Sequence, residues 1–397
     1  MGLNETQSAE RINIGFFGAR NAGKSSLVNA ITNQHVAVVS DVAGTTTDAV
    51  RKSMELAPLG PVMIIDTPGF DDVGSLGEKR ILETKKILAT SDIAVLVVDA
   101  IKGIGSTEKE LTDIFIEKGI PYIIAYNKSD MLVKIPEAAD NEIYVSALFD
   151  RNIEELKNKI GKFCKNDKQI RFVADFVKPG DVVVLVVPID ESAPKGRLIL
   201  PQQQAIRDIL DAGGQALVVK DDGLEDALQR MSEKPSLVIT DSQVFEFVDS
   251  VTPEDIPLTS FSILMARYKG FLDMAVKGAQ VIGTIEDGDK VLICEGCTHH
   301  RQCNDIGTVK LPNMLRKTTG KDITFEFTSG RDFPEKLEGY KLIIHCGGCM
   351  LNDKEVRNRM EKAVNQEVPV TNYGTSIAYV KGILERSIAP VYNLYKQ

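Results

Sequence analysis

The sequence of 397 residues contains no long apolar run and no block of basic residues. Its longest apolar stretches, such as 182–189, fall far short of the ~18 residues that a helix needs to span a bilayer. No signal-peptide pattern opens the chain. The formal net charge is −9, and no basic, aromatic-rich patch is present, which argues against nucleic acid or an anionic membrane as the main partner. We therefore expect a cytoplasmic protein that acts without nucleic acid and without a membrane.

Cysteine and histidine are scarce, with six and four copies. Five of the cysteines lie between 294 and 349, and His299, His300 and His345 lie in or beside the same two turns. This clustering is not the framework of a secreted disulfide-rich protein. In a reducing compartment it indicates a metal site.

The length predicts two or three domains, at ~150 residues per domain. Strand-like apolar runs alternate with helix-like segments along the chain, which predicts an α/β fold with mostly parallel sheets. We place the domains at 1–168, 169–257 and 258–397. The first is expected to be a Ras-like P-loop domain, and the other two to be further α/β domains.

A phosphate-binding loop follows the first predicted strand. The apolar run 12–17 leads into 18–25, which reads GARNAGKS, and a helix-like segment follows. This is the G-x-x-x-x-G-K-[ST] pattern in the strand and helix context that it requires. Its backbone N–H groups can converge on phosphate, Lys24 can neutralise the β and γ oxygens, and Ser25 can offer a hydroxyl to Mg²⁺. The predicted nucleotide contacts of this loop are Gly18, Asn21, Ala22, Gly23, Lys24, Ser25 and Ser26.

Three downstream motifs identify the nucleotide as GTP. Asp66 ends a strand-like run where it can hold the Mg²⁺ shell, and Gly69 can present its N–H to the γ-phosphate. The segment 127–130 reads NKSD and fits a guanine clamp, and 146–148, which reads SAL, matches the backbone loop over the guanine oxygen. The predicted base contacts are Asn127, Lys128, Asp130, Ser146 and Ala147. The order and spacing of these motifs resemble the Ras-like GTPase family over roughly residues 10–165.

The switch I segment points to one branch of the Ras-like GTPase family. Residues 44–48 read GTTTD, which resembles the branch that contains the tRNA-modifying and ribosome-assembly GTPases, where the threonine at position 46 binds Mg²⁺. Asn21 occupies the loop position that helps to coordinate K⁺ in potassium-stimulated members. Phe70 stands where Ras-like proteins carry a glutamine, and it cannot orient water. We therefore expect K⁺ to assist hydrolysis.

The candidates for catalysis are Lys24, Thr46, Gly69 and Glu78. Glu78 lies twelve residues beyond Asp66 and could orient the attacking water, as a similarly placed glutamate does in the tRNA-modifying relative. The competing interpretation is a helix N-terminal charge favoured by the helix dipole. His35, in the same switch region, is interpreted as a solvated loop residue.

The middle region carries no catalytic signal. Strands are predicted at 182–189, 216–219 and 236–240, with helices at 201–212 and 224–231. The near-continuous apolar run 182–189 favours a central strand covered on both faces. The alternative is an edge strand completed by a second subunit.

Two cysteine turns follow predicted strands in the last region. Residues 297–299 read CTH after one apolar run, and 345–349 read HCGGC after another. A helix over 262–274 and a third strand over 322–327 complete the pattern. Carboxyl ends of parallel strands meet at one edge of a sheet, so the two turns are expected to form one site.

The spacing alone leaves two metals open. Cys294 and Cys297 with Cys346 and Cys349 form a C-x-x-C pair that is typical of structural zinc. However, Cys294 continues an apolar strand and could be a buried thiol. Three thiolates would then remain, which can hold a 4Fe-4S cluster with one iron free for another ligand.

The pattern CTH followed by HCGGC, downstream of a potassium-type GTPase domain, resembles the HydF family of hydrogenase maturation GTPases. Residues 188–201 and 258–267 also look like that family. The resemblance implies a GTPase domain, a dimerisation domain and a domain that holds a 4Fe-4S cluster on Cys297, Cys346 and Cys349. His299 and His345 match the motif as candidate metal ligands, whereas Cys164 and Cys303 match nothing and are interpreted as structural.

The resemblance further implies a homodimeric scaffold. A diiron precursor, made by two radical-SAM maturases, would be held there before transfer to apo-[FeFe]-hydrogenase. The alternative is a potassium-dependent GTPase of RNA modification or ribosome assembly with a structural zinc domain.

Overall fold

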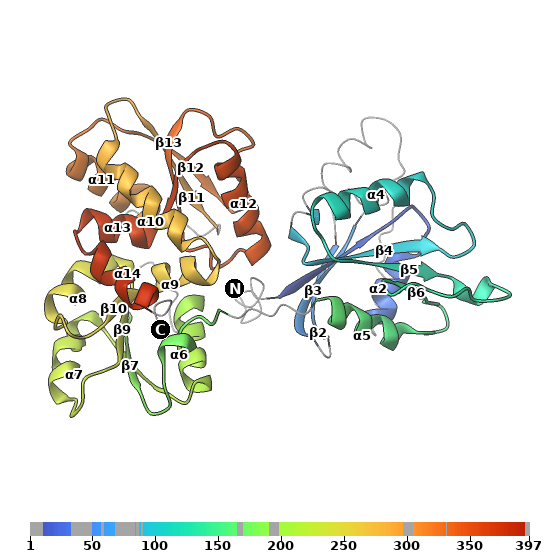
Figure 1. Ribbon diagram of the computed structural model, residues 1–397, viewed down its shortest axis with the longest axis horizontal. Helices are drawn as coiled ribbons and strands as arrows, with labels where there is room; N and C mark the ends of the chain where they lie inside the picture. Colours follow the sequence, from blue (N-terminus) through green and yellow to red (C-terminus); the bar gives the residue numbers. More distant parts are fainter. Residues whose placement is uncertain are drawn as a thin grey trace. The chain divides into compact units, whose positions relative to one another are not determined.

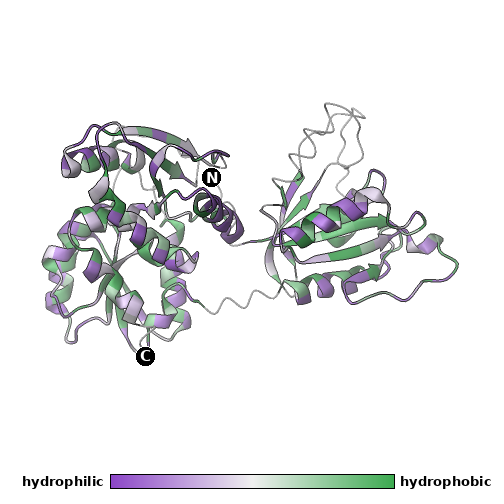
Figure 2. Ribbon diagram, turned by 45° about the horizontal axis from the view of Figure 1, so that its top comes forward, coloured by the Kyte–Doolittle hydropathy of each residue, from purple (hydrophilic) through white to green (hydrophobic). Residues whose placement is uncertain are grey.

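The computed structural model describes residues 11–32, 50–56, 59–67, 84, 87–88, 90–164, 170–189, 198–296, 305–330 and 332–393. The chain forms two compact units, Met1–Asp167 and Lys168–Gln397 (Figure 1). In each unit the strands are predominantly hydrophobic, and the helices carry hydrophilic stretches (Figure 2). Within the described ranges, no helix combines the length and the apolar character that crossing a membrane requires.

The first unit is a six-stranded sheet with helices. Its elements are β1 (Ile12–Phe17), α2 (Lys24–Thr32), β2 (Val50–Leu56), β3 (Gly60–Asp66), β4 (Ile93–Asp99), α4 (Ser106–Glu117), β5 (Tyr122–Asn127), β6 (Glu142–Tyr144) and α5 (Ile153–Phe163). The strand order is β2-β3-β1-β4-β5-β6. Among the strands described for this sheet, only β2 and β3 pair in the antiparallel sense. The predicted Ras-like α/β fold is confirmed.

Strand β4 explains why this sheet is a middle layer. All seven of its residues are buried. Val95 and Val97 belong to the core on one face, whereas Leu96 and Val98 belong to the core on the other. A continuous apolar strand is what a parallel sheet covered on both faces requires.

The second unit contains two four-stranded parallel sheets. The elements of the first are β7 (Val182–Val186), α6 (Leu200–Asp211), β8 (Gln215–Val219), α7 (Leu224–Arg230), β9 (Leu237–Thr240), α8 (Phe245–Val251) and β10 (Leu258–Ser260). Its strand order is β10-β9-β7-β8. Strand β7 pairs on both sides, so the predicted central strand is confirmed and the edge alternative is wrong. The strand ends at Val186 rather than at Ile189.

The second sheet carries the cysteine turns. The elements that follow β10 are α9 (Phe261–Tyr268), α10 (Leu272–Gln280), β11 (Lys290–Glu295), α11 (Leu311–Thr319), β12 (Thr324–Ser329), β13 (Tyr340–His345), α12 (Asp353–Asn365), β14 (Val370–Asn372), α13 (Tyr373–Val380) and α14 (Leu384–Asn393). The strand order is β12-β11-β13-β14. The strand predicted over 322–327 is therefore present. The predicted boundary at 257 stays a prediction, and β10, which follows it, pairs with β9 of the preceding sheet.

The predicted helix over 262–274 is wrong as a single element. Helix α9 ends at Tyr268, and α10 begins at Leu272. Gly270 between them has a φ of +83°. This left-handed conformation ends a helix and is the one that glycine adopts without strain.

The two sheets of the second unit have the same topology. In each, the first strand in sequence lies between the second and the third, and the fourth flanks the third. Each fourth strand leads into a helix capped by a polar side chain, Ser260 for α9 and Asn372 for α13. Each of these helices is followed by a Lys-Gly pair whose glycine has a positive φ. The second unit is therefore built from two copies of one architecture.

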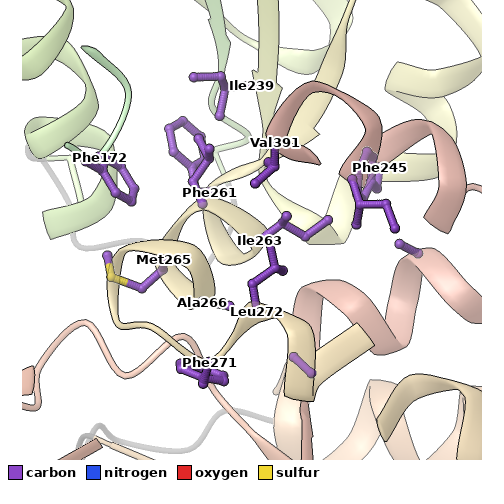
Figure 3. Packing of buried hydrophobic residues seen from close by; sticks show 14 of the residues in the cluster. Phe172, Ile239, Phe245, Phe261, Ile263, Met265, Ala266, Phe271, Leu272 and Val391 are labelled. Atoms are coloured by element: carbon purple, nitrogen blue, oxygen red, sulfur yellow. The ribbon is translucent and has the colours of Figure 1, made fainter. Parts of the chain in front are cut away.

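The two copies exchange helices. Helix α10 follows the first copy but packs on β14 of the second, and α14 follows the second copy but packs on β10 of the first. Figure 3 shows Val391 of α14 beside Phe261 and Ile263 of α9 in a shared core. Arg386 of α14 binds Asp249 Oδ1 at 2.7 Å and the Thr252 carbonyl at 2.8 Å. The two copies thus form one compact unit.

Candidate functional site

The phosphate loop is shaped by two glycines. Gly18 has a φ of +142°, and a Cβ there would lie 2.2 Å from the Val97 carbonyl oxygen. Gly23 has a φ of +91°, and a Cβ there would lie 2.3 Å from Asn127 Nδ2. Both the backbone conformation and the close packing therefore exclude side chains at these positions. This packing sets the loop against the carboxyl ends of β4 and β5.

The first turn of α2 presents the two polar groups expected at the phosphates. Lys24 Nζ donates to the carbonyls of Gly18 at 2.9 Å and Ala19 at 2.8 Å, which holds the ammonium inside the loop. Ser25 Oγ donates to Asp66 Oδ2 at 2.6 Å. Burial raises the pKa of Asp66, and the Ser25 hydrogen bond and the Lys24 charge oppose that shift. The structure thus brings together Ser25 and Asp66, two of the three side chains predicted to bind Mg²⁺. Ser26, like Ser25, is exposed.

The predicted guanine clamp is assembled by hydrogen bonds between its motifs. Asn127 Nδ2 donates to the Ala22 carbonyl at 3.1 Å, and its Oδ1 accepts from Ala147 N at 3.1 Å. Ser146 Oγ donates to Asp130 Oδ1 at 2.6 Å. The side chain of Asn127 therefore links the phosphate loop to the loop that contains Ser146 and Ala147, which we call the base-binding loop.

Lys128 adds a contact that the sequence did not indicate. Its Nζ donates to the Asn21 carbonyl at 2.9 Å and to Asp99 Oδ2 at 2.6 Å. Burial raises the pKa of Asp99, but the hydrogen bonds from Lys128 and Ile101 outweigh it and leave the pKa below its usual value. Asp99 ends an apolar strand, as Asp66 does, and this position in the sequence could have indicated its role.

Several predicted residues lie outside the described part of the chain. In the GTPase unit these are Thr46, Gly69 and Glu78, together with His35 and Phe70. In the cysteine region they are Cys297, His299, His300 and Cys303.

The strands β11 and β13 bring the two cysteine turns to one edge. They are parallel neighbours, with Cys294 in register with His345. Directly beyond them, Gly296 N–H donates to Cys346 Sγ at 3.0 Å, and Gly348 N–H donates to the same sulfur at 3.4 Å. The residue before Cys297 is thus in contact with the second turn, as the parallel-strand argument predicted.

Cys346 and Cys349 are both partly buried. Burial raises the pKa of the Cys346 thiol, and its two backbone N–H donors oppose that shift. Burial followed by the nearby Cys346 raises the pKa of Cys349 to about 12. Backbone N–H groups aimed at sulfur fit a thiolate ligand, because they stabilise its charge. The donor set is therefore compatible with a thiolate-ligated metal centre.

Cys294 has a different environment. Its side chain is fully buried in the hydrophobic core with Leu292 and Ile343. Burial raises the pKa of its thiol to about 12. This agrees with the buried-thiol interpretation, and it places Cys294 within the core and not in the turn. Cys164, at the end of α5, is likewise a mostly buried thiol with a pKa raised to about 12.

His345 is fully buried, and both of its ring nitrogens have protein partners. Nδ1 lies 2.7 Å from the Cys346 carbonyl oxygen, and Nε2 lies 3.1 Å from Arg359 Nη1. Because arginine only donates, Nε2 accepts and Nδ1 carries the proton. Burial and then the Arg359 charge lower the pKa of His345 to about 4, so the ring is neutral. This geometry does not support the predicted metal-ligand role, because neither nitrogen is free.

Among the residues that the structure describes, no three histidine, cysteine or carboxylate side chains are grouped closely enough to hold a metal ion. The third predicted thiolate, Cys297, belongs to the segment outside that range.

Three protein families match successive parts of the chain. Residues 13–128 match the family described as 50S ribosome-binding GTPase. Residues 172–270 match the hydrogen maturase F dimerization domain, and residues 273–390 match the hydrogen maturase F tetramerization domain.

Curated relatives named as GTPases match about a third of this chain. GTPase Der of Maridesulfovibrio salexigens is 36% identical over 135 residues, which are 33% of this chain and 30% of that protein. The tRNA modification GTPase MnmE of a Thermoanaerobacter species is 33% identical over 159 residues, which are 38% of this chain and 34% of that protein. The chain therefore spans about a third of the length of these relatives.

Among solved structures, one titled as a probable GTP-binding protein engB is 27% identical, with a TM-score of 0.32. The similarity covers 38% of this chain and 98% of that one. The GTPase motifs, the cysteine turns and the two maturase-specific domains together show that the chain belongs to the hydrogen maturase F family.

Proposed function

We propose that this protein is a GTP-hydrolysing scaffold that holds a 4Fe-4S cluster on Cys297, Cys346 and Cys349. It assembles or delivers the diiron precursor of the [FeFe]-hydrogenase active site. The observation that carries the proposal is the pair of backbone N–H groups on Cys346 Sγ, one of them from Gly296 next to Cys297. The maturase-specific domains on either side of residue 271 support it.

The chain's own residues set the properties of this cluster site. The β13 turn presents Cys346 and Cys349, and the amide of Gly296 approaches the first sulfur. When bound, a 4Fe-4S cluster on three cysteines supplies one iron that can take an exchangeable ligand. The diiron precursor is the cargo, received from radical-SAM maturases and passed to apo-[FeFe]-hydrogenase.

In the GTPase unit, Lys24 binds the β- and γ-phosphates, and Ser25 and Asp66 hold Mg²⁺ with Thr46. Gly69 meets the γ-phosphate, and Glu78 orients the attacking water. Asn21 helps to bind K⁺. This ion takes over the role of the catalytic glutamine of Ras-like proteins, because Phe70 occupies the position of that glutamine. The hydrolysis rate in K⁺ and in Na⁺ at equal ionic strength tests this role, and we expect it to fall markedly in Na⁺. Equal rates would remove K⁺ from the proposal.

The family domains support a homo-oligomer. We propose that the homodimer is the working form, in the cytoplasm. Hydrolysis acts as a switch, since loss of the γ-phosphate releases the segments that it had ordered.

The first test is the content of iron, acid-labile sulfide and zinc after anaerobic purification and reconstitution, with an EPR spectrum after reduction. We expect about four irons and four sulfides per chain and the signal of a reduced 4Fe-4S centre. Cys346→Ser should abolish both. Cys164→Ser, in the GTPase unit, is the control that should leave both unchanged.

A single zinc that iron does not replace would overturn the cluster and favour the second candidate, a GTPase of RNA modification with a structural zinc. The relative named tRNA modification GTPase MnmE favours that candidate. The net charge of −9 opposes it. Tight, salt-sensitive RNA binding at physiological salt would decide for it.

A further inference from the structure

Two buried cations contact the segment that bears the cysteines. We define the cysteine turn as residues 345–351. The side chain of Arg359, on α12, is 4% exposed, and that of Lys269, just after α9, is 3% exposed. Buried charges are costly unless they are paired and hydrogen-bonded, so the partners of these two residues show what they do.

Lys269 holds the end of the cysteine turn. Its Nζ donates to the Leu351 carbonyl at 2.9 Å and pairs with Asp353 Oδ1 at 2.7 Å. Lys269 belongs to the part that matches the dimerization domain, whereas the cysteine turn belongs to the part that matches the tetramerization domain. The first copy of the architecture therefore supplies a residue to the cysteine turn of the second.

Arg359 holds the start of the same turn through His345. Its Nη1 donates to His345 Nε2 at 3.1 Å, and the opposite ring nitrogen binds the Cys346 carbonyl. Its Nη2 donates to the Gly330 carbonyl at 2.7 Å and to Glu355 Oε1 at 2.9 Å. These contacts hold the guanidinium in place, and through His345 it supports the main chain of Cys346, a predicted cluster ligand.

We propose that Lys269 and Arg359 are positioning residues of the cluster site, and that their charges stabilise its reduced form. This rests on the proposed function. Three thiolates outweigh the positive charge of the cluster core, and one-electron reduction adds a further negative charge. Nearby cations in a poorly screened interior favour that added charge. Removing one cation also leaves the charge of its carboxylate partner uncompensated, and this further destabilises the reduced cluster.

The repeated architecture provides a matched control. Lys381 follows α13 as Lys269 follows α9, and each precedes a glycine of positive φ. Lys381 pairs with Glu246 in the first turn of α8, as Lys269 pairs with Asp353 in the first turn of α12. The turn beside α8 carries no cysteine. Lys381→Met therefore removes the equivalent cation at a distance from the cluster site.

The experiment uses the full chain, reconstituted with iron and sulfide without oxygen. The readouts are iron content, the EPR spectrum and the midpoint potential in a dithionite titration. Lys269→Met should lower the iron content and shift the potential to more negative values. We expect about a tenfold change in the equilibrium constant of reduction, or about 59 mV for one electron.

Four further variants separate the effect of charge from an effect on folding. Lys269→Gln keeps an N–H donor for the Leu351 carbonyl without the charge, so it should keep iron but show the lower potential. Lys269→Arg should restore the wild-type potential, and Lys381→Met should match wild type. Arg359→Gln should also lower the potential and alter the EPR signal, because the Cys346 main chain loses its support.

The outcomes distinguish this inference from the proposed function. A wild-type chain that binds no iron overturns both. A wild-type chain with a normal cluster, and with Lys269→Gln and Arg359→Gln at the same potential, overturns the inference alone. Equal shifts in Lys269→Gln and Lys381→Met would also overturn it, because the effect would then not depend on proximity to the cysteine turn.

Discussion

Asp130 is positioned to select the base of the nucleotide. Its Oδ1 accepts from Ser146 Oγ at 2.6 Å, which fixes the carboxylate beside the base-binding loop. A carboxylate matches the two donors that guanine presents, its ring N1–H and its exocyclic amino group, whereas the amide of an asparagine does not.

We expect Asp130→Asn to weaken GTP binding by about 100-fold or more, since hydrogen bonds to a charged group contribute ~1.5–3 kcal/mol each. Xanthine nucleotide, whose ring offers a different donor pattern, should gain relative affinity. Titration with fluorescent GTP and XTP analogues measures both. Asp140→Asn, at an exposed loop acid, is the control, and an unchanged GTP affinity in Asp130→Asn would contradict the clamp.

Lys24 tests whether the two sites are independent. Its ammonium is held in the phosphate loop, so Lys24→Ala should abolish GTP hydrolysis. The cysteine turn belongs to the other compact unit, and iron content after reconstitution should therefore be unchanged. Loss of iron in this variant would show that the cluster site depends on the GTPase unit.

Sequence motifs predicted residues whose chemistry is local, and they missed residues whose role depends on packing. The motifs predict that Ser25 and Asp66 both bind Mg²⁺, and the two side chains lie in hydrogen-bond contact. Arg359 could not be found in this way, because it reaches His345 from a helix that begins beyond the turn. His345 was predicted as a ligand from its neighbours in sequence, but its partners are set by the fold.

At the scale of elements, the interface between α10 and β14 depends on a missing side chain. A Cβ on Gly278 would lie 2.0 Å from the Val370 carbonyl oxygen. Glycine inside a helix normally costs ~1 kcal/mol relative to alanine, so the sequence alone would suggest that Gly278→Ala stabilises the protein.

We expect the opposite sign. The obstructing atom belongs to the backbone and cannot move aside cheaply, so Gly278→Ala should lower the free energy of unfolding of the second unit by ~1–2 kcal/mol. Denaturant titration measures this. Gly223→Ala is the control, because a Cβ there meets nothing within 4 Å and the φ is −95°. A stabilised Gly278→Ala variant would contradict the close approach of α10 to β14.

Most elements could be predicted from apolar periodicity, and the exceptions have a physical cause. The 262–274 segment is apolar on both sides of Gly270, so periodicity does not reveal the break that the positive φ imposes. The duplicated strand order is not visible in residue identities, since Thr240 of β9 corresponds to His345 of β13. What repeats is the pairing of strands, which the chain specifies only through packing.

At the scale of the whole molecule, the exchange of α10 and α14 makes residues 168–397 a single folding unit. We expect the fragment 168–397 to unfold in one cooperative transition. Fragments 168–270 and 271–397 should not fold separately, because β10 would lose α14 and β14 would lose α10. Circular dichroism and denaturant titration of the three fragments test this. Independent folding of either half would contradict it.

The boundaries between domains could be predicted only in part for the same reason. The polar joint near residue 168 separates two units that have their own cores. The joint at 252–257 has a linker composition, but the strand after it returns to the same sheet. The composition of a segment such as 252–257 indicates that it is exposed, but it does not indicate which sheet the following strand joins.

The exchange of helices also orders events during synthesis. Strand β10 leaves the ribosome long before α14, the helix that covers it, has been made. At ~5–20 residues per second, the interval between them is roughly ten seconds. Throughout that time the dimerization-domain half exposes an apolar surface on the nascent chain. Chaperones that recognise such surfaces can act during this interval. The interval ends only when residues 384–393 have been translated and have docked.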